Sequence, residues 1–322
     1  MPIDTIAILT PVYNDWPSFE KLLLEIDHVF ANQNSQITIT VIAVDDGSTL
    51  RPCFAKPRES FSNIQRIDII ELVRNLGHQK AITIGLAYVQ QHYPCPVIVM
   101  DSDGEDRPSD IPRLIQGLEN NQEKIVFAER SRRSEGFMFV FFYILYRQLF
   151  RLLTGKKISF GNFSILPHSL LRRVVYLPEI WNHFAAGVIR SGLPLDTVES
   201  IRGKRYQGKS KMNFISLVMH GMSAISVYLD VVATRLILFS LFVISVTIIG
   251  FIFLLYVRFM TFLAIPGWAT TVAIGLVIIL FQSIFFLASL SFLVLSFRSN
   301  KAFIPAKDYT DYIFEVKMEY SK

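Results

Sequence analysis

Two long apolar stretches near the C-terminus constrain this chain more than any other feature. Neither Leu236–Val257 nor Ala269–Phe297 contains a charged residue, and each exceeds the about 20 residues that a helix needs to cross a bilayer. The connection between them contains Pro266 and Gly267, which suits a tight turn. Core helices of a soluble domain are the alternative, but both stretches lack a polar face. The sequence therefore predicts a hairpin of two transmembrane helices over residues 236–257 and 269–297.

The composition agrees with a membrane protein. Hydrophobic residues make up 51% of the chain and charged residues 18%, against about 25% charged residues in ordinary soluble proteins. This excludes a disordered chain. The net charge of +5 is compatible with binding to nucleic acid, to an anionic membrane or to a phosphorylated ligand. It does not distinguish among these three partners. The two cysteines, Cys53 and Cys95, provide neither a disulfide framework nor a metal-binding quartet.

Basic residues gather on both sides of the hairpin rather than in its connection, which holds only Arg258. They are Lys204, Arg205, Lys209, Lys211, Arg235, Arg298, Lys301 and Lys307. By the positive-inside rule, both termini and the N-terminal domain are expected in the cytoplasm, with residues 298–322 as a cytoplasmic tail. Because the charge lies beside the spans and no recognition motif occurs, no nucleic-acid partner is expected.

Two further stretches are apolar but interrupted by polar residues. Residues 137–153 are rich in aromatic side chains and contain Arg147 and Arg151, and residues 213–235 contain His220 and Asp230. We predict amphipathic helices at the membrane surface for both, the second as a juxtamembrane helix. Ordinary core helices are the alternative.

The first 130 residues or so alternate between strand and helix patterns. Short apolar strands are predicted at Ile6–Leu9, Ile37–Val44, Ile67–Val73, Val97–Met100 and Lys124–Ala128. Such alternation predicts an α/β domain with a mostly parallel sheet and helices on both faces. Ligands of these sheets bind beyond the carboxyl ends of the strands.

The residues that follow these strands are strongly polar. Asp45 and Asp46 follow the second strand, and Asp101 and Asp103 follow the fourth. Two carboxylates at this spacing can share a hard divalent cation, whose other positions go to phosphate oxygens and water. A solvated acidic turn is the alternative. The sequence thus predicts a site for a metal ion and a phosphorylated ligand.

Several motifs together resemble those of family 2 glycosyltransferases with a GT-A fold, which is Rossmann-like. They are TPVYND from Thr10, VDDGS from Val44, RNLGHQKAITIGL from Arg74, MDSDGEDRP from Met100 and RGKRYQGKSKM from Arg202. The chain is most similar to the polyprenyl-phosphate branch, which includes bactoprenol glucosyltransferases and dolichyl-phosphate mannose synthase. The resemblance implies a catalytic domain over residues 1–212 and the transfer, with inversion, of a sugar from a nucleotide diphosphate to a polyprenyl phosphate, undecaprenyl or dolichyl.

The resemblance also implies roles for individual residues. The nucleotide sugar would be bound by Pro11, Tyr13, Asp15, Asp45, Asp46, Lys80 and Asp101. Mg²⁺ or Mn²⁺ would be bound by Asp103 and Asp101. The catalytic residues would be Asp101, Asp103, Arg130 and Asn162. The lipid phosphate would be bound by Arg133, Arg202, Arg205, Ser210 and Lys211. A homodimer or homotetramer is a further possibility.

Three residues depart from the family pattern. Glu105 replaces the usual Gln, Glu129 replaces a usually apolar residue, and Asn162 stands where many relatives carry Asp. A phosphate acceptor is already an anion at neutral pH, whereas a hydroxyl acceptor needs a positioned base. Asn162 therefore suits a phosphate acceptor. Two alternatives stay open: another lipid or glycan acceptor, and a catalytically silent membrane scaffold that binds nucleotide sugars.

Overall fold

The computed structural model describes residues 3–31, 37–50, 61–130, 137–156, 160–207, 214–261, 267–299 and 301–322. The chain divides into two compact units. One unit, here called the sheet unit, comprises Met1–Arg147, Lys157–Val227 and Ala302–Lys322. The other, called the hairpin unit, comprises Gln148–Lys156 and Tyr228–Lys301.

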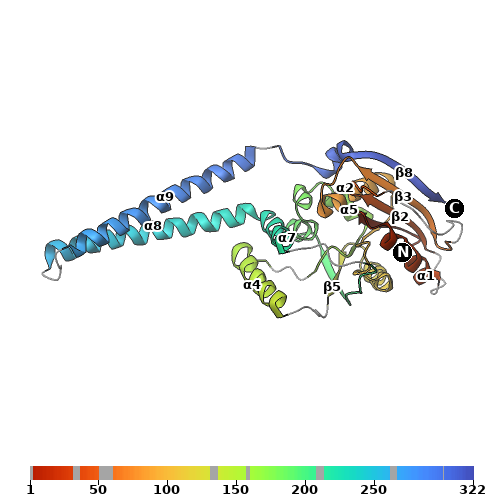
Figure 1. The fold of residues 1–322 in the computed structure, drawn as a ribbon, viewed down its shortest axis with the longest axis horizontal. Helices are drawn as coiled ribbons and strands as arrows, with labels where there is room; N and C mark the ends of the chain where they lie inside the picture. Colours follow the sequence, from red (N-terminus) through yellow and green to blue (C-terminus); the bar gives the residue numbers. More distant parts are fainter. Residues whose placement is uncertain are drawn as a thin grey trace. The chain divides into compact units, whose positions relative to one another are not determined.

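The sheet unit contains an eight-stranded mixed sheet in the order β7-β5-β6-β4-β1-β2-β3-β8 (Figure 1). β6 is antiparallel to β4 and β5, β8 is antiparallel to β3, and the remaining neighbours are parallel. The strands are β1 (Thr5–Val12), β2 (Thr38–Asp45), β3 (Ile64–Leu72), β4 (Val97–Val99), β5 (Ile125–Arg130), β6 (Ser164–Leu166), β7 (Leu195–Ser200) and β8 (Ile313–Ser321). The mostly parallel α/β sheet and its first five strands confirm the prediction.

Helices cover both faces of this sheet because the central strands carry apolar side chains on both sides. On one face, Leu9 and Val44 pack with residues of α2 such as Ile84, and Gly85 lets that helix approach closely, since an added methyl group would lie 2.3 Å from Leu9. On the other face, Ile8 packs with residues of α1 and α3. The helices of this unit are α1 (Trp16–Ala31), α2 (His78–His92), η2 (Pro108–Asp110), α3 (Ile111–Asn120), α5 (His168–Val174), η3 (Pro178–Trp181), α6 (Phe184–Ser191), α7 (Phe214–Ser226), α10 (Pro305–Asp308) and η4 (Tyr309–Tyr312).

The C-terminal residues correct one prediction. Residues 298–322 do not form a separate tail, because β8 pairs along the whole length of β3 and lies beside it in Figure 1. Tyr309 is 3% exposed and belongs to the core beneath α2. Tyr309 also donates a hydrogen bond from its hydroxyl to Gln91 at 2.9 Å. The domain predicted over residues 1–212 is therefore larger than expected. It also contains residues before the hairpin, up to Val227, and residues after it, Ala302–Lys322.

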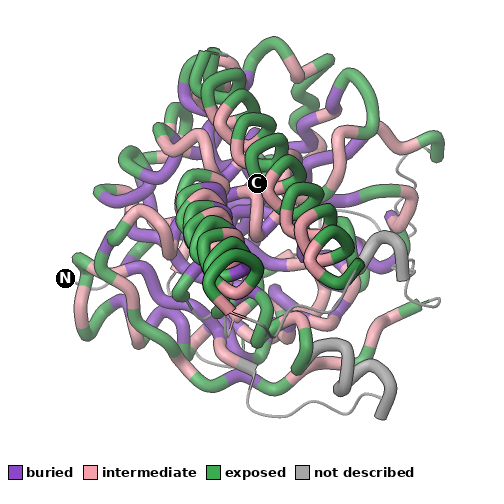
Figure 2. The backbone as a smooth tube through the Cα atoms, turned by 90° about the vertical axis from the view of Figure 1, so that its left-hand side faces the viewer, coloured by how far each residue is buried: buried purple, intermediate pink, exposed green. Residues whose placement is uncertain are grey.

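The hairpin unit contains α8 (Leu229–Met260) and α9 (Trp268–Ser299), which pack against each other near Gly250 and Leu276. Both helices are long and apolar enough to cross a membrane, with mean hydropathies of 2.8 and 2.5. Their residues are mostly green and pink in Figure 2, and in α9 none is buried. A hydrophobic surface of this extent requires an apolar environment.

The predicted helix over residues 213–235 is wrong in its boundaries. Helix α7 ends at Ser226, and residues 229–235 form the first turns of the next helix, α8. Asp230 lies in the first turn of α8, where a negative charge is favourable. The other predicted surface helix, residues 137–153, is α4 (Phe137–Thr154), and Leu145 and Leu149 on it are exposed. Its location at a membrane surface stays a prediction.

Candidate active site

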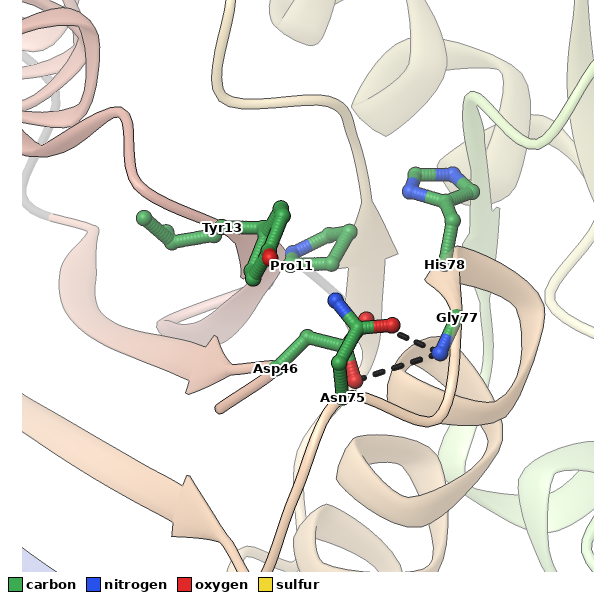
Figure 3. A pocket seen from close by; sticks show the side chains of 7 residues that line it. Pro11, Tyr13, Asp46, Asn75, Gly77 and His78 are labelled. Carbon is green, nitrogen blue, oxygen red and sulfur yellow. Dashed lines mark hydrogen bonds between the residues drawn. The ribbon is translucent and has the colours of Figure 1, made fainter. Parts of the chain in front are cut away.

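A pocket lies at the carboxyl ends of β1 and β2, where Pro11, Tyr13 and Asp46 meet Gly77 and His78 from the start of α2 (Figure 3). Pro11 and Asp46 come from neighbouring strand ends, which explains why motifs far apart in the sequence converge here. Tyr13 is 42% exposed and lines this pocket. The predicted nucleotide-binding residues Pro11, Tyr13 and Asp46 are thus brought together.

The two carboxylates at the end of β2, those of Asp45 and Asp46, are buried and hydrogen-bonded by backbone groups. Asp45 accepts a hydrogen bond from the Ser48 N–H at 2.8 Å. Asp46 accepts from the N–H groups of Leu76 and Gly77 at 2.7 and 2.9 Å. Burial raises the pKa of both carboxyl groups, and these hydrogen bonds lower it in part. Asp46 therefore fixes the loop before α2, and its role is structural at least in part.

A second group of charges lies in the loop after β4, named here the acidic loop, residues 101–106. The side chain of Asp103 pairs with Arg205 at 2.5 Å between Oδ2 and Nη2, and Glu105 pairs with Arg202 at 2.7 Å. The Glu105 N–H also donates to Oδ1 of Asp103 at 2.9 Å. Arg202 and Arg205, predicted to bind the lipid phosphate, are thus located at the predicted metal-binding carboxylates.

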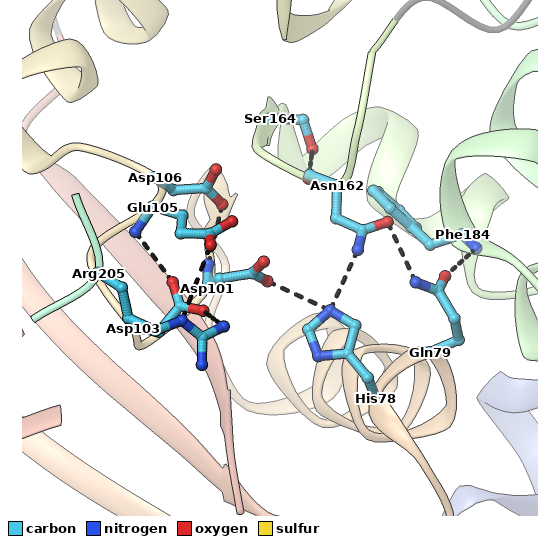
Figure 4. Close-up of polar contacts among 10 residues, drawn as sticks. All are labelled: His78, Gln79, Asp101, Asp103, Glu105, Asp106, Asn162, Ser164, Phe184 and Arg205. Carbon is cyan, nitrogen blue, oxygen red and sulfur yellow. Dashed lines mark hydrogen bonds and ion pairs between the residues drawn. The ribbon is translucent and has the colours of Figure 1, made fainter. Parts of the chain in front are cut away.

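Asp101 lies between this group and α2, as Figure 4 shows. Its Oδ1 is 3.2 Å from Nε2 of His78, and Nδ2 of Asn162 is 3.1 Å from the same nitrogen. Gln79 donates to Asn162 at 3.4 Å and accepts from the Phe184 N–H at 2.7 Å, which connects the start of α2 to that of α6. Asp101 and Asn162, both predicted to be catalytic, are therefore linked through His78.

The charges in this region shift two pKa values. Burial raises the pKa of Asp103, and the neighbouring carboxylate of Asp101 raises it further, while Arg205 lowers it. Burial lowers the pKa of His78, but the ion pair with Asp101 and the charges of Asp106 and Asp103 outweigh this effect and raise it overall. The crowded carboxylates favour the binding of cations.

The carboxylates suit a hard divalent cation. Asp101 and Asp103 provide the oxygen ligands that Mg²⁺ and Mn²⁺ prefer. Among the described residues, no group of three or more His, Cys, Asp or Glu side chains is arranged to hold a metal ion by itself. Mg²⁺ is typically bound by one or two carboxylates together with substrate phosphates, so this donor set fits a cation that binds with a nucleotide diphosphate.

Comparison with known proteins identifies the family. Residues 7–180 match the family model described as glycosyl transferase family 2. The chain belongs to this family. It is a glycosyltransferase, and its sheet has the GT-A fold that the sequence motifs predicted.

Relatives extend over most of this glycosyltransferase. An uncharacterized glycosyltransferase of Bacillus subtilis, YkcC, is 27% identical over 84% of this chain and 82% of its own length. The undecaprenyl-phosphate 4-deoxy-4-formamido-L-arabinose transferase of Klebsiella pneumoniae is 23% identical over 88% of this chain and 84% of its own. Glucosyl-3-phosphoglycerate synthase of Mycobacterium tuberculosis, solved with Mn²⁺, UDP-glucose and phosphoglyceric acid, shares the fold with a TM-score of 0.51 and 15% identity, over 71% of this chain and 80% of that one.

Other predicted site residues of the glycosyltransferase lie elsewhere or cannot be placed. The ammonium of Lys80 lies 5.1 Å from the centre of the Trp181 ring rather than in the pocket. Asp15 precedes α1, where its carbonyl accepts from the Phe19 N–H at 3.2 Å, and it does not line the pocket. Four predicted groups lie outside the described residues: the side chain of Arg130, and the whole of Arg133, Ser210 and Lys211.

The motifs did not single out His78, Gln79 or Asn14. Asn14 has a positive φ of 51°, and its side-chain oxygen accepts from the N–H groups of Thr49 and Leu50, which joins the turns after β1 and β2. A signal for His78 was present, because it directly follows Gly77 within the motif RNLGHQKAITIGL. The backbone at Gly77 has a φ of 99°, which other residues rarely adopt.

Proposed function

We propose that the chain transfers a sugar from a nucleotide-diphosphate sugar to a polyprenyl phosphate at the cytoplasmic face of a membrane, with inversion at the anomeric carbon. The observation that carries the proposal is the meeting of the acidic loop with Arg202 and Arg205 at one edge of the sheet. Carboxylates there suit the cation of a diphosphate, and guanidinium groups suit an acceptor phosphate. The relative from Klebsiella pneumoniae, named for an undecaprenyl-phosphate acceptor, supports this assignment.

The donor would lie across the pocket and the acidic loop. Tyr13 and Pro11 would contact the base, and Asp45 the ribose. Asp101 and Asp103 would hold Mg²⁺ or Mn²⁺, which when bound neutralises charge on the leaving diphosphate. A phosphate oxygen of the acceptor forms a bond to the anomeric carbon as the bond from that carbon to the diphosphate oxygen breaks. The nucleoside diphosphate then leaves with the electron pair of that bond.

The contacts of Asn162 support a phosphate acceptor. Its amide is 3.1 Å from His78 and within 3.4 Å of Gln79, so it belongs to a positioning network. An amide cannot act as the base that a hydroxyl acceptor needs, whereas an anionic phosphate requires orientation and desolvation. Asn162 at this position is therefore compatible with the chemistry that we propose.

The exposed apolar surface supports a place at the membrane. α8 and α9 are long enough to span a bilayer, and α7 exposes Met219 and Met222 beside them in the sequence. With basic residues before α8 and after α9, the rule for positive charges assigns the sheet unit to the cytoplasmic side. A polyprenyl phosphate presents its head group at that surface.

The test is transfer of labelled sugar by the purified full chain. Undecaprenyl phosphate would be incubated with UDP-glucose, UDP-galactose, GDP-mannose or UDP-N-acetylhexosamine, with Mg²⁺ or Mn²⁺. We expect label in an acid-labile lipid, and a loss of about 10²–10³-fold in kcat for Asp103→Asn, because a preorganised charge at the leaving group is removed. Asp196→Asn is the control, because Asp196 is exposed on β7 and pairs with Lys124. Full activity in Asp103→Asn, or donor binding without transfer to any polyprenyl phosphate, would refute the proposal.

A further inference from the structure

The backbone of residues 202–206, named here the basic segment, is docked onto the acidic loop. The Gly203 N–H donates to the carbonyl of Glu105 at 2.8 Å, and the Tyr206 N–H donates to the carbonyl of Asp103 at 2.8 Å. The Tyr206 hydroxyl donates to Glu25 of α1 at 2.6 Å. The basic segment is thus held by main-chain and side-chain bonds from two elements.

Two glycines allow this close approach. A Cβ added to Gly203 would lie 2.1 Å from the carbonyl oxygen of Gly104, a separation that real side chains do not show. A Cβ added to Gly104 would lie 2.7 Å from the ring of Tyr206, and Gly104 has a φ of 87°. Both glycines are therefore required for this contact, which depends on backbone shape as well as on charge.

The docked arginines direct their guanidinium groups at the carboxylates. Arg205 contacts Oδ2 of Asp103 at 2.5 Å and lies 3.7 Å from Glu105. Arg202 contacts Oε2 of Glu105 through Nη2 at 2.7 Å and Nε at 3.2 Å. The side chains of Asp103 and Glu105 are 15% and 17% exposed, so solvent screens these pairs only in part. Since Glu105 is anionic, the acidic loop can pair with both arginines.

We propose that Arg205 is an internal counter-cation that a divalent cation must displace from Asp103, and that this exchange releases Arg205 to bind the acceptor phosphate. A Mg²⁺ ion held by Asp103 would lie about 2.0–2.1 Å from a carboxylate oxygen, and it would therefore compete with the guanidinium that already contacts this side chain. Two cations that close repel each other. The inference rests on the proposed function and adds a competition between Arg205 and the cation for the carboxylate of Asp103.

The exchange is tested by Mn²⁺ binding, measured on the purified full chain from the electron paramagnetic resonance signal of free Mn²⁺. Arg205→Gln removes the competing charge, and we expect its dissociation constant for Mn²⁺ to fall about tenfold, as loss of a charged hydrogen bond predicts. Gly203→Ala keeps both arginines but pushes the basic segment away, so it too binds Mn²⁺ more tightly. Lys204→Gln is the control, because Lys204 is exposed and makes no ion pair among the residues that the structure describes.

The acceptor provides the second measurement. Arg205→Gln raises the KM for undecaprenyl phosphate, whereas Gly203→Ala, which keeps the guanidinium groups, leaves it unchanged or lowers it. Opposite effects of Arg205→Gln on the two ligands are the signature of the exchange. Melting temperatures verify that each variant is folded. If Gly203→Ala does not fold, the exchange is judged from the results for Arg205→Gln alone.

Two failures are distinguishable. Should Arg205→Gln bind Mn²⁺ with unchanged or weaker affinity while the unsubstituted protein transfers sugar, Arg205 does not compete with the cation, and the exchange is overturned with the function intact. Should the unsubstituted protein bind no Mn²⁺ in the presence of UDP and transfer no sugar, the proposed function itself fails.

Discussion

Asp46 offers the sharpest test of how the loop before α2 is held. It is 4% exposed, and its carboxylate accepts hydrogen bonds from the N–H groups of Leu76 and Gly77. Gly77 has a φ of 99°, and the next residue, His78, pairs with Asp101. In Asp46→Ala, both N–H groups lose their charged acceptor. We expect the loop to loosen and the position of His78 to become less defined.

The magnitude follows from the two hydrogen bonds. Each bond to a charged group contributes about 1.5–3 kcal/mol, and water that enters the space recovers part of this. We expect Asp46→Ala to reduce the free energy of unfolding by about 3 kcal/mol, which lowers the melting temperature by ~6–12 °C in a unit of this size. Asp46→Asn keeps one acceptor oxygen but places an amide N–H₂ group near a backbone donor. The free energy of unfolding should therefore fall by about half as much as in Asp46→Ala.

The assay combines thermal unfolding with hydrogen exchange of individual peptides. The amides of residues 76 and 77 should exchange faster in Asp46→Ala than in the unsubstituted protein, while those of the central strands keep their protection. Asp196→Ala, an exposed carboxylate on β7, is the matched control. A melting temperature equal to that of the control, with unchanged exchange at residues 76 and 77, would show that Asp46 does not hold this loop.

Two further predictions concern stability. Burial, assisted by the charges of His220 and His78, lowers the pKa of His183 from 6.5 to about 3. Between these values the unfolded state binds a proton that the native state does not, so stability falls as the pH drops. This contributes a loss of about 2 kcal/mol from pH 8 to pH 5. In His183→Asn, which can still cap α6, melting curves should show a smaller loss, and an unchanged loss would contradict this assignment. Ending the chain after residue 235 removes β8 and should abolish the folded sheet unit, whereas replacing residues 228–301 by a flexible Gly/Ser linker should leave it folded, as judged by solubility and UDP binding. Equal behaviour of the two would argue against a structural role for β8.

The success of sequence reasoning depends on how local each signal is. β1 and β2 are predictable because continuous apolar residues lie between turn residues, as expected of strands buried on both faces. β8 has the alternation of apolar and charged residues that is typical of a strand, but its place in the sheet is not predictable, because its partner β3 is distant in the sequence. The ion pair of β8, between Lys317 and Glu71 at 2.8 Å, is likewise non-local.

The same distinction applies to the site. Asp101 and Asp103 are predictable because they follow a buried strand in a known motif. Their contacts are not: Arg205 reaches Asp103 across 102 residues of sequence, and the contact requires Gly203 and Gly104 to lie backbone to backbone. A motif identifies residue types, while the geometry that makes an arginine a counter-ion of a carboxylate depends on the folded chain.

The hairpin lies within the sequence of the sheet unit and not at its end. Residues up to Val227 and from Ala302 onward belong to the sheet unit, so the hairpin is an insertion in that unit rather than an appendage at its end. Residues on both sides of the hairpin pack against residues 181–183 of the sheet unit. On one side, His220 of α7 packs against His183, with 4.6 Å between ring centres.

On the other side, Phe303 packs against Trp181, whose ring also contacts Lys80, two residues after His78. An enzyme that acts on a phosphate carried by a long lipid must keep its site at the interface, because moving the lipid chain into water costs about 0.8 kcal/mol for each CH₂ group. One flexible connection would allow the site to leave the interface. Because the chain returns to the sheet through β8 after α9, the sheet unit has two covalent connections to the hairpin of α8 and α9 rather than one.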